Sequence, residues 1–414
     1  MKIAYIGIPA HGHTNPTLPV MRELVARGHE ALYYNAAWFR EKVAPTGVDF
    51  HAYPEPIPDE RAVTEALGEI ITASRLLAGM SERLTPFMLD QMARARPDVI
   101  LYDSVAMWGY LAARIRRIPH ICSITHFVLD GSQRSIGVGE LARYIWTALP
   151  HVPALMRWKR CMTRRYGKDV VGGITEYGDL NLVFTSREFH PPNRFVDERF
   201  RFVGPSIDPA MRAGDDALDF AFDEIDEIDE IDEIGDGPLV SISLGTISNV
   251  NPLFYRTAFD AFSGYPARFI LAAGRQIDLT GLGPIPANFI VRQYTPQLEV
   301  LRHAQAFITH GGLNSVHEGL YYGTPEIVVP HQLEQALNGK RVAETGAGVL
   351  LGARPPYGRL TAKQLRAALD EMLSKAIYRD NAQRIGETLR AAGGYTRAAG
   401  EIEAFAEVKS SQPL

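Results

Sequence analysis

The chain has 414 residues, of which 46% are hydrophobic and 22% charged, so it is long enough for two globular domains of ordinary soluble composition. Its two cysteines argue against a disulfide framework and indicate a reducing compartment, so we expect a cytoplasmic protein. The net charge of -5 is local in origin, because eight carboxylates lie in the repeat "DEIDEIDEIDEI" at 223–234, and 43 basic residues face 40 acidic ones elsewhere. No basic surface of the kind that binds nucleic acid is expected.

The first half of the chain alternates apolar runs with helical patterns. The predicted strands are nearly continuously apolar, which is typical of parallel strands covered by helices on both faces. We therefore expect a doubly wound α/β domain. Its strands are "KIAYIGI", "EALYYN", "DVILYD" at 98–103, "PHICSI" at 119–124, "LNLVFTS" at 180–186 and "RFRFVGP" at 199–205, with a helix at 16–27 after the first.

The same rhythm starts again at residue 237. We expect a second α/β domain there, with strands in "GPLVSISLGT", "ARFILAAG", "ANFIVRQY", "AQAFITHGG" and "PEIVVP". The predicted organisation is an N-terminal domain at 1–205, an acidic linker at 206–236, a C-terminal domain at 237–390, and a final helix and tail at 391–414 that returns to the N-terminal domain.

Two charged segments have more than one interpretation. The acidic repeat is expected to be a solvated linker, because its carboxylates repel one another; a calcium or magnesium site would need turn glycines and mixed oxygen ligands. The basic stretch "RWKRCMTRRYGK" at 157–168 follows Trp146 and Leu149. It is either a solvated helix face or a surface that touches an anionic membrane without stable insertion.

The loop "IPAHGHTNP" at 8–16 follows the first strand but lacks the G-x-G-x-x-G pattern, so a nicotinamide or flavin site is not expected. Asn15 and Pro16 predict a helix start, with the helix ending at Gly28. His13 would then lie at the positive end of that helix, where a neutral imidazole suited to a general base is favoured. Asp103 ends another strand at the same sheet edge, where it either steadies His13 or caps the next helix.

The most specific segment is residues 294–338. Its strand "AFITH" ends at His310 and is followed by Gly311-Gly312 and a predicted helix starting near Asn314. Bare backbone, a helix N-terminus and an imidazole together predict an anion site. Glu318, one turn into the helix, could accept hydrogen bonds from a ribose diol. Glu334 and Gln335 are further polar groups that could hold hydroxyls.

These motifs resemble those of the family 1 glycosyltransferases, the nucleotide-sugar-dependent enzymes that include bacterial macrolide and plant natural-product glycosyltransferases. The resemblance covers nearly the whole chain, with the opening loop, the "SLGT" turn and the 294–338 block in the expected order. It implies the GT-B fold, in which two Rossmann-like domains face each other across a cleft. The acceptor would bind mainly to the N-terminal half and the donor mainly to the C-terminal half.

The resemblance also implies roles for individual residues. His13 matches the family's base, Asp103 its supporting acid, and His11 is left to shape the loop or the donor cleft. The donor residues implied are Thr246, Tyr294, Gln297, His310, Gly312, Asn314, Ser315, Glu318, Glu334 and Gln335. Two of these depart from the family pattern, because Tyr294 stands where Trp is common and Glu334 where Asp is common, which bears on the sugar more than on the reaction.

The implied reaction is inverting, metal-independent transfer of a hexose, with glucose from UDP-glucose expected first, to a hydroxyl of a small apolar acceptor. No cofactor is expected beyond the nucleotide sugar as co-substrate. The acceptor contacts expected are Phe87, Trp108, Phe127 and Trp146. The alternatives are a lipid-linked sugar transferase at a membrane surface, a sugar-nucleotide epimerase of the same fold, and a non-catalytic nucleotide-sugar binding protein.

Overall fold

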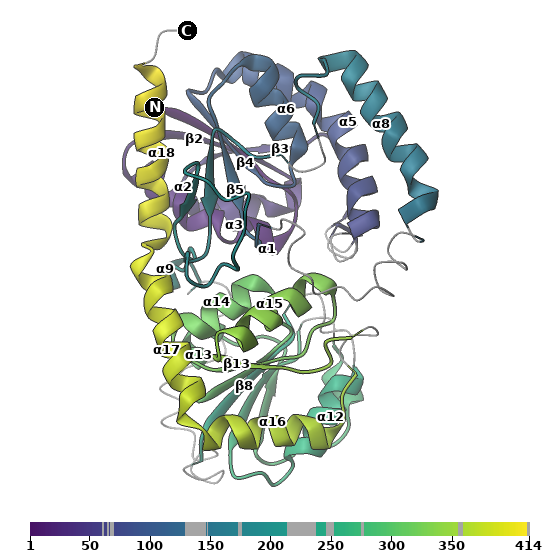
Figure 1. The fold of residues 1–414 in the computed structure, drawn as a ribbon, viewed down its shortest axis with the longest axis vertical. Coiled ribbons are helices and arrows are strands. Elements are labelled where there is room, and N and C mark those ends of the chain that lie inside the picture. Colours follow the sequence, from purple (N-terminus) through teal and green to yellow (C-terminus); the bar gives the residue numbers. More distant parts are fainter. Residues whose placement is uncertain are drawn as a thin grey trace. The chain divides into compact units, whose positions relative to one another are not determined.

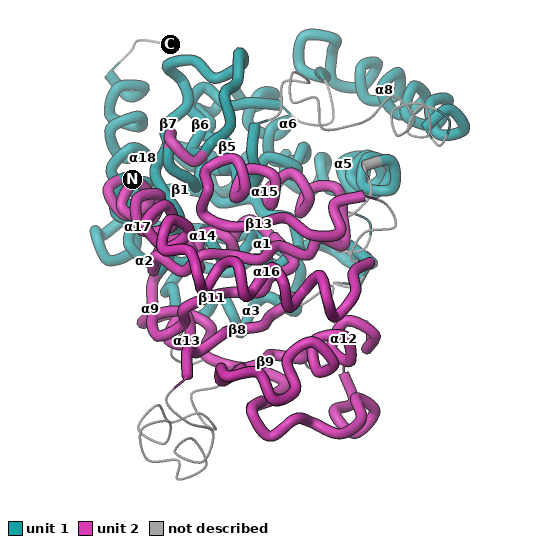
Figure 2. Tube along the Cα trace, turned by 60° about the horizontal axis from the view of Figure 1, so that its bottom comes forward, with its two compact units in different colours: residues 1–186, 190–207, 392–414 teal, residues 187–189, 208–391 magenta. Residues whose placement is uncertain are grey.

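The computed structural model describes residues 1–59, 62, 63, 66, 70–128, 146, 148–172, 176–212, 237–245, 252–274, 277–354 and 359–411. The chain forms two compact α/β units (Figures 1 and 2). Unit 1 contains residues 1–186, 190–207 and 392–414, and unit 2 contains residues 187–189 and 208–391. The acidic repeat at 223–234 lies outside the described residues.

Unit 1 is built on a seven-stranded sheet of order β3-β2-β1-β4-β5-β6-β7 in which every pairing is parallel. Buried apolar residues fill both sheet faces, as the continuous apolar runs predicted. The strands are β1 (Lys2–Ile6), β2 (Glu30–Asn35), β3 (Asp49–Ala52), β4 (Val99–Asp103), β5 (His120–Ile124), β6 (Leu180–Val183) and β7 (Phe200–Phe202).

Helices cover both faces of this sheet. On one face, alternate strand residues such as Ile6 and Tyr102 join a core with the two helices α5 and α6. On the other face, Tyr33 of β2 meets Thr17 of α2 through hydroxyl groups 2.9 Å apart. The C-terminal helix α18 packs beside α2, where Glu403 pairs with Arg27 at 2.6 Å. The helices are α1 (His11–Thr14), α2 (Thr17–Ala26), α3 (Arg40–Val43), α5 (Ile70–Ala95), α6 (Met107–Arg116), α8 (Val152–Tyr166) and α18 (Gly394–Ser410), with 3-10 turns at Ala37–Phe39, Ala44–Thr46 and Leu149–His151.

Unit 2 is a second all-parallel sheet, of six strands in the order β10-β9-β8-β11-β12-β13. Helix α14 packs over β11 and β12 and is itself covered by α17. The strands are β8 (Leu239–Ser243), β9 (Arg268–Ala272), β10 (Phe289–Arg292), β11 (Ala306–Thr309), β12 (Glu326–Val328) and β13 (Gly348–Leu350). The helices are α9 (Pro209–Arg212), α12 (Pro252–Phe262), α13 (Gln297–His303), α14 (Leu313–Tyr321), α15 (Leu333–Glu344), α16 (Ala362–Ser374) and α17 (Ala376–Ala391), with a 3-10 turn at Leu279–Leu282.

Two doubly wound parallel-sheet domains are therefore present, as predicted. The strand order of unit 2, and of the first six strands of unit 1, is that of the dinucleotide-binding α/β fold, 3-2-1-4-5-6. In such sheets, ligands bind outside the carboxyl ends of the strands where the order reverses, between β1 and β4 in unit 1 and between β8 and β11 in unit 2. These two switch points locate the candidate site residues.

Candidate active site

The loop after β1 folds differently from the prediction. A helix start at Asn15 and Pro16 was expected, but the chain is already helical at His11–Thr14, and α2 begins at Thr17 with Pro16 as its N-cap. The backbone N–H of Asn15 donates to the carbonyl of His11 at 2.9 Å, which closes this first turn. His13 therefore lies inside a one-turn helix, and the argument that the end of α2 keeps its ring neutral does not apply. The predicted helix end is confirmed, with Gly28 at φ +86°.

The switch point of unit 1 brings His13 and Asp103 together. The Nδ1 atom of His13 lies 2.8 Å from Oδ2 of Asp103, and the side chain of His13 is 19% exposed whereas that of Asp103 is fully buried. The other carboxylate oxygen of Asp103 accepts from the backbone N–H of Val105 at 3.0 Å. Because a carboxylate only accepts, Nδ1 carries the proton and the ring's basic lone pair is on Nε2. The pair has the geometry of a base held by a buried acid.

Asp103 does not cap the next helix, which was the alternative prediction. The N-cap of α6 is Ala106, and that helix end has no side-chain capping hydrogen bond. The carboxylate is instead held between His13 and the β4–α6 turn. Its burial, with both oxygens engaged, fixes the position of the imidazole.

Three neighbours of this pair were not predicted from the sequence. Thr125 Oγ1 lies 3.1 Å from the same Nδ1 of His13, and Ser104 Oγ lies 3.0 Å from Nε2 of His126. Burial, followed by the nearby His13, lowers the pKa of His126, which favours a neutral ring there. The β4–β5 register, which pairs Asp103 with Ser123, is the signal that places Thr125 and His126 beside the dyad.

The switch point of unit 2 holds His310 between two glycines. A Cβ on Gly245 would lie 2.5 Å from His310 Cε1, and one on Gly312 would lie 2.6 Å from Nε2. Gly245 has φ +71°, so glycine is required there for backbone conformation as well. Both positions therefore need glycine, so that the His310 ring can lie directly against the backbone. Gly245 is in the loop after β8, and Gly312 is the N-cap of α14.

His310 is neutral in this position. Burial, with a smaller contribution from the nearby His331, lowers its pKa to about 3. The positive potential for an anion therefore comes from the N-terminus of α14, whose first N–H groups have no partner within the helix, and His310 contributes a hydrogen-bonding nitrogen rather than a charge. Asn314 and Ser315 stand half-buried in the first turn of α14. This arrangement can bind a phosphate group.

Glu318 is buried one turn further along α14. Its Oε2 accepts a hydrogen bond of 2.6 Å from Nε2 of Gln297, at the start of α13. Behind it, on β12, the carboxyl of Glu326 is fully buried, and burial together with the charge of Glu318 raises the Glu326 pKa well above its usual range. The structure thus joins Gln297 and Glu318 in one hydrogen-bonded pair, as candidate donor residues from two helices.

Glu334 and Gln335 have different environments at the start of α15. Glu334 is exposed, and its Oε1 accepts from Nδ2 of Asn338 at 2.7 Å. Gln335 is buried, and its Oε1 accepts from the backbone N–H of His331 at 2.7 Å. Asn338 also donates to the carbonyl of Gly311 at 2.9 Å, which ties α15 to the glycine turn. Asn338 was not predicted, although its i, i+4 spacing from Glu334 was available as a signal.

The two remaining donor candidates are Tyr294 and Thr246. Tyr294 is half-buried just after β10, three residues before Gln297. Thr246 lies outside the described residues, although the preceding Gly245 contacts the His310 ring.

The four predicted acceptor contacts fall in different environments. Phe87 and Trp108 both pack edge-on against Tyr53, with ring centroids 6.5 and 6.0 Å away. Phe127 is buried against His190, and Trp146 is 77% exposed.

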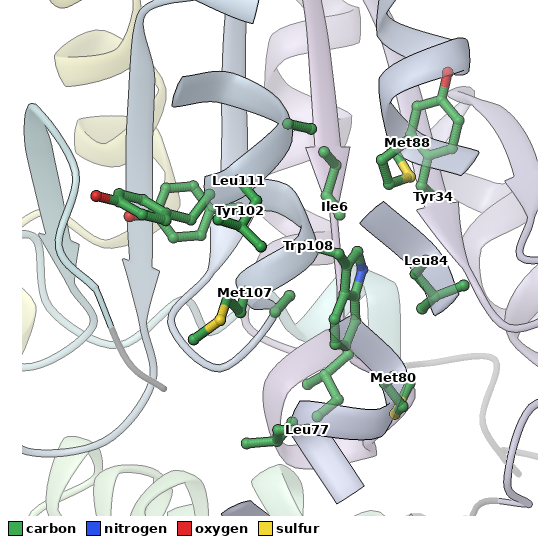
Figure 3. Packing of buried hydrophobic residues seen from close by; sticks show 14 of the residues in the cluster. Ile6, Tyr34, Leu77, Met80, Leu84, Met88, Tyr102, Met107, Trp108 and Leu111 are labelled. Atoms are coloured by element: carbon green, nitrogen blue, oxygen red, sulfur yellow. The ribbon is translucent and has the colours of Figure 1, made fainter. Parts of the chain in front are cut away.

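Trp108 requires a correction to its predicted role as an acceptor contact. It is completely buried in the core, where its indole N–H donates to Tyr53 at 3.0 Å. Figure 3 shows its indole among Ile6, Leu84 and Met80. A side chain packed on all sides cannot contact an acceptor without rearrangement of the core, so Trp108 is a core residue.

Two further properties of the described residues bear on the site. Within them, no three His, Cys, Asp or Glu side chains gather in a way that could hold a metal ion. No helix in the described part of the chain combines the length and apolar character needed to cross a membrane.

Comparison with known proteins identifies the family of this chain. Residues 266–405 match the family model described as erythromycin biosynthesis protein CIII-like, C-terminal domain. The chain is 30% identical to the uncharacterized UDP-glucosyltransferase YojK of Bacillus subtilis (strain 168), over 97% of this chain and 96% of that protein. It is also 30% identical to the oleandomycin glycosyltransferase of Streptomyces antibioticus, over 97% of this chain and 90% of that protein.

A solved structure shows the same fold. The glycotransferase of kitacinnamycin superposes with a TM-score of 0.80 at 28% identity, with 98% of each chain covered. The two parallel-sheet domains and this structural neighbour define a GT-B glycosyltransferase. The chain belongs to the family 1 glycosyltransferases.

Proposed function

We propose that the protein transfers a hexose from a nucleotide diphosphate sugar to a hydroxyl group of a small apolar, natural-product-like acceptor, with inversion at the anomeric carbon. UDP-glucose is the first donor to test, because the similar protein YojK is described as a UDP-glucosyltransferase. The similar oleandomycin glycosyltransferase and the glycotransferase of kitacinnamycin favour a polyketide-like or other natural-product acceptor.

The observation that carries this proposal is the hydrogen bond of 2.8 Å between His13 and the buried Asp103. In the proposed reaction, Nε2 of His13 takes the proton of the acceptor hydroxyl while that oxygen forms a bond to the anomeric carbon. The bond from the anomeric carbon to the diphosphate oxygen breaks, and the diphosphate leaves with the electron pair. Asp103 stabilises the imidazolium that forms. A single displacement of this kind inverts the anomeric centre.

The donor would be held by unit 2. The N-terminus of α14, with Gly312 at its cap, stabilises the negative charge that develops on the leaving diphosphate, and His310 would contact the diphosphate as a neutral ring. Glu318, with Gln297 bonded to it, would accept from the ribose hydroxyls, and Glu334 would hold sugar hydroxyls. Because a helix end can do the electrostatic work of a cation, we propose that the reaction needs neither a metal ion nor any cofactor besides the co-substrate.

The acceptor pocket is proposed from fewer residues than the sequence indicated. Phe87 is half-buried, next to the buried Tyr53, and Phe127 is buried next to His126, which neighbours the His13–Asp103 pair. We keep these two aromatic side chains as candidate acceptor contacts. Trp108 is omitted because it belongs to the core, and Trp146 because its exposure leaves it without an enclosing wall.

The test is a mass-spectrometric screen of several nucleotide sugars against phenolic, macrolide and terpenoid acceptors, with and without a chelator. We expect a glycosylated product with at least one soluble acceptor, at an unchanged rate in the chelator. A reaction with the donor alone that gives an epimer would instead establish the epimerase. Activity confined to lipid-linked acceptors would establish the membrane transferase.

A further inference from the structure

Helix α8 has a narrow buried face on the outside of unit 1. Trp158 and Met162 are buried against α5, with Leu155 partly buried beside them, and the indole N–H of Trp158 donates to Ser81 of α5 at 3.1 Å. Figure 1 shows α8 lying along α5 at the periphery of the described part of unit 1. These contacts fix which side of α8 faces the protein.

The opposite side of α8 carries a row of arginines. Arg157, Arg160 and Arg164 are spaced three and four residues apart, so they form one stripe on the helix, and all three are exposed. Lys159 and Arg165 are exposed on either side of the stripe. No acidic residue occurs between 151 and 168, and these five cations have no ion-pair partner among the residues that the structure describes. The outer side of α8 is therefore strongly positive.

Large apolar side chains are exposed just before α8 and in its first turns. Trp146 is 77% exposed, Leu149 60% and Met156 51%, and Val152 is exposed as well. Exposed apolar side chains grouped on one element usually mark an interaction surface. A cationic stripe with Trp and aliphatic side chains beside it is the pattern of a helix that lies in the interface of a membrane.

We infer that α8, together with Trp146 and Leu149, docks this protein on an anionic lipid bilayer. The arginine stripe would bind lipid phosphates, and Trp146, Leu149 and Met156 would enter the interface between headgroups and acyl chains. The exposed apolar side chains favour a bilayer over nucleic acid as the partner, because binding to nucleic-acid phosphates would use the arginines alone and leave the apolar side chains in water. At 15 residues, α8 is too short to span a bilayer, so the contact is peripheral.

This docking is independent of the proposed reaction. The surface contains neither His13 nor Asp103, and it belongs to the solvent side of α8. If the proposed function is also correct, an apolar acceptor would concentrate in the same bilayer. The two proposals are nevertheless independent, and an experiment that contradicts one does not contradict the other.

The test is co-sedimentation of the full chain with vesicles. We expect binding to vesicles of equal parts phosphatidylglycerol and phosphatidylcholine, weakened by high salt, and little binding to phosphatidylcholine alone. The triple variant Arg157→Glu, Arg160→Glu, Arg164→Glu should lose at least about tenfold in apparent affinity, because each basic residue near such a surface contributes about 1 kcal/mol. A matched triple reversal of Arg354, Arg359 and Lys363, which are exposed on unit 2, should bind like the wild type.

A spectroscopic measurement separates bilayer binding from charge attraction alone. Trp146 is the most exposed of the large apolar side chains, so its fluorescence should shift to the blue on vesicle binding, and Trp146→Phe should lose that shift. Equal binding to heparin or DNA with no fluorescence shift would overturn the proposal, as would binding that the α8 triple leaves unchanged. Absence of binding to the anionic vesicles would also overturn it.

Discussion

Asp103→Asn tests the role assigned to the buried acid. The carboxylate accepts from His13 Nδ1 at 2.8 Å and from the backbone N–H of Val105 at 3.0 Å. If the asparagine oxygen keeps the Val105 contact, its NH₂ group faces Nδ1. The ring must then accept there and carry its proton on Nε2, so it can no longer act as a base.

The loss of activity expected for Asp103→Asn is large and affects catalysis but not donor binding. Loss of general-base catalysis should lower kcat by about 10²- to 10⁴-fold, which is about 3 to 5 kcal/mol of transition-state stabilisation. Binding of UDP should stay within about twofold, since the residues proposed to hold it belong to unit 2. The assay is steady-state transfer to the best acceptor of the screen, with UDP binding measured by calorimetry.

A second acid–histidine pair provides the control. Asp49 accepts from His51 at 2.9 Å, but it is exposed and far from the switch point in sequence and sheet order. Asp49→Asn should therefore leave kcat unchanged. The reasoning about the dyad is refuted if Asp103→Asn, correctly folded, keeps kcat within about threefold of the wild type.

Three further predictions concern unit 2. Gly312→Ala should raise the Kd for UDP by at least about tenfold, because its Cβ would lie 2.6 Å from His310. The control Gly281→Ala, which has no atom within 4 Å of the added Cβ, should leave the Kd unchanged. Calorimetry that finds equal Kd values for the two variants would contradict this prediction. Glu318→Gln should raise KM for the donor on the order of tenfold with a smaller change in kcat, and steady-state kinetics that show only a kcat effect would argue against a ribose contact. Burial lowers the pKa of His310 and of His317 to about 3. Below pH 6.5 these two rings therefore take up protons in the unfolded chain but not in the folded one. Each of the two histidines should lower the free energy of unfolding by about 2 kcal/mol between pH 7 and pH 5. Urea unfolding should show that His317→Leu removes about half of this loss, and an unchanged loss in that variant would contradict the assignment.

The sequence predicted the central strands because both faces of each are buried. Strands such as β1 and β4 are apolar at every central position, which no amphipathic helix would be. The sequence missed β3 and β13, which lie at sheet edges with four and three residues and only partial burial. Short edge strands lack the apolar run on which the prediction relied.

The candidate site was predictable where sheet topology decided it. His13 follows β1 and Asp103 ends β4, and these two strands are neighbours at a switch point, so their meeting could be expected from the order of the elements. The start of α2 was not predictable, because Asn15 closes the turn of α1 instead of capping the next helix. Trp108 illustrates a further limit, since aromatic residues serve both cores and pockets and only packing distinguishes the two.

The most direct test of the account is a comparison of His13→Ala with the wild type, using UDP-glucose and the best acceptor. The wild type should convert the α-linked donor to a β-glycoside, identified by the anomeric proton in an NMR spectrum. His13→Ala should bind UDP-glucose nearly as tightly and form this product at least about 10²-fold more slowly. Wild-type turnover in His13→Ala, or an α-linked product from the wild type, would contradict the central claim that His13 activates the acceptor for a single inverting displacement.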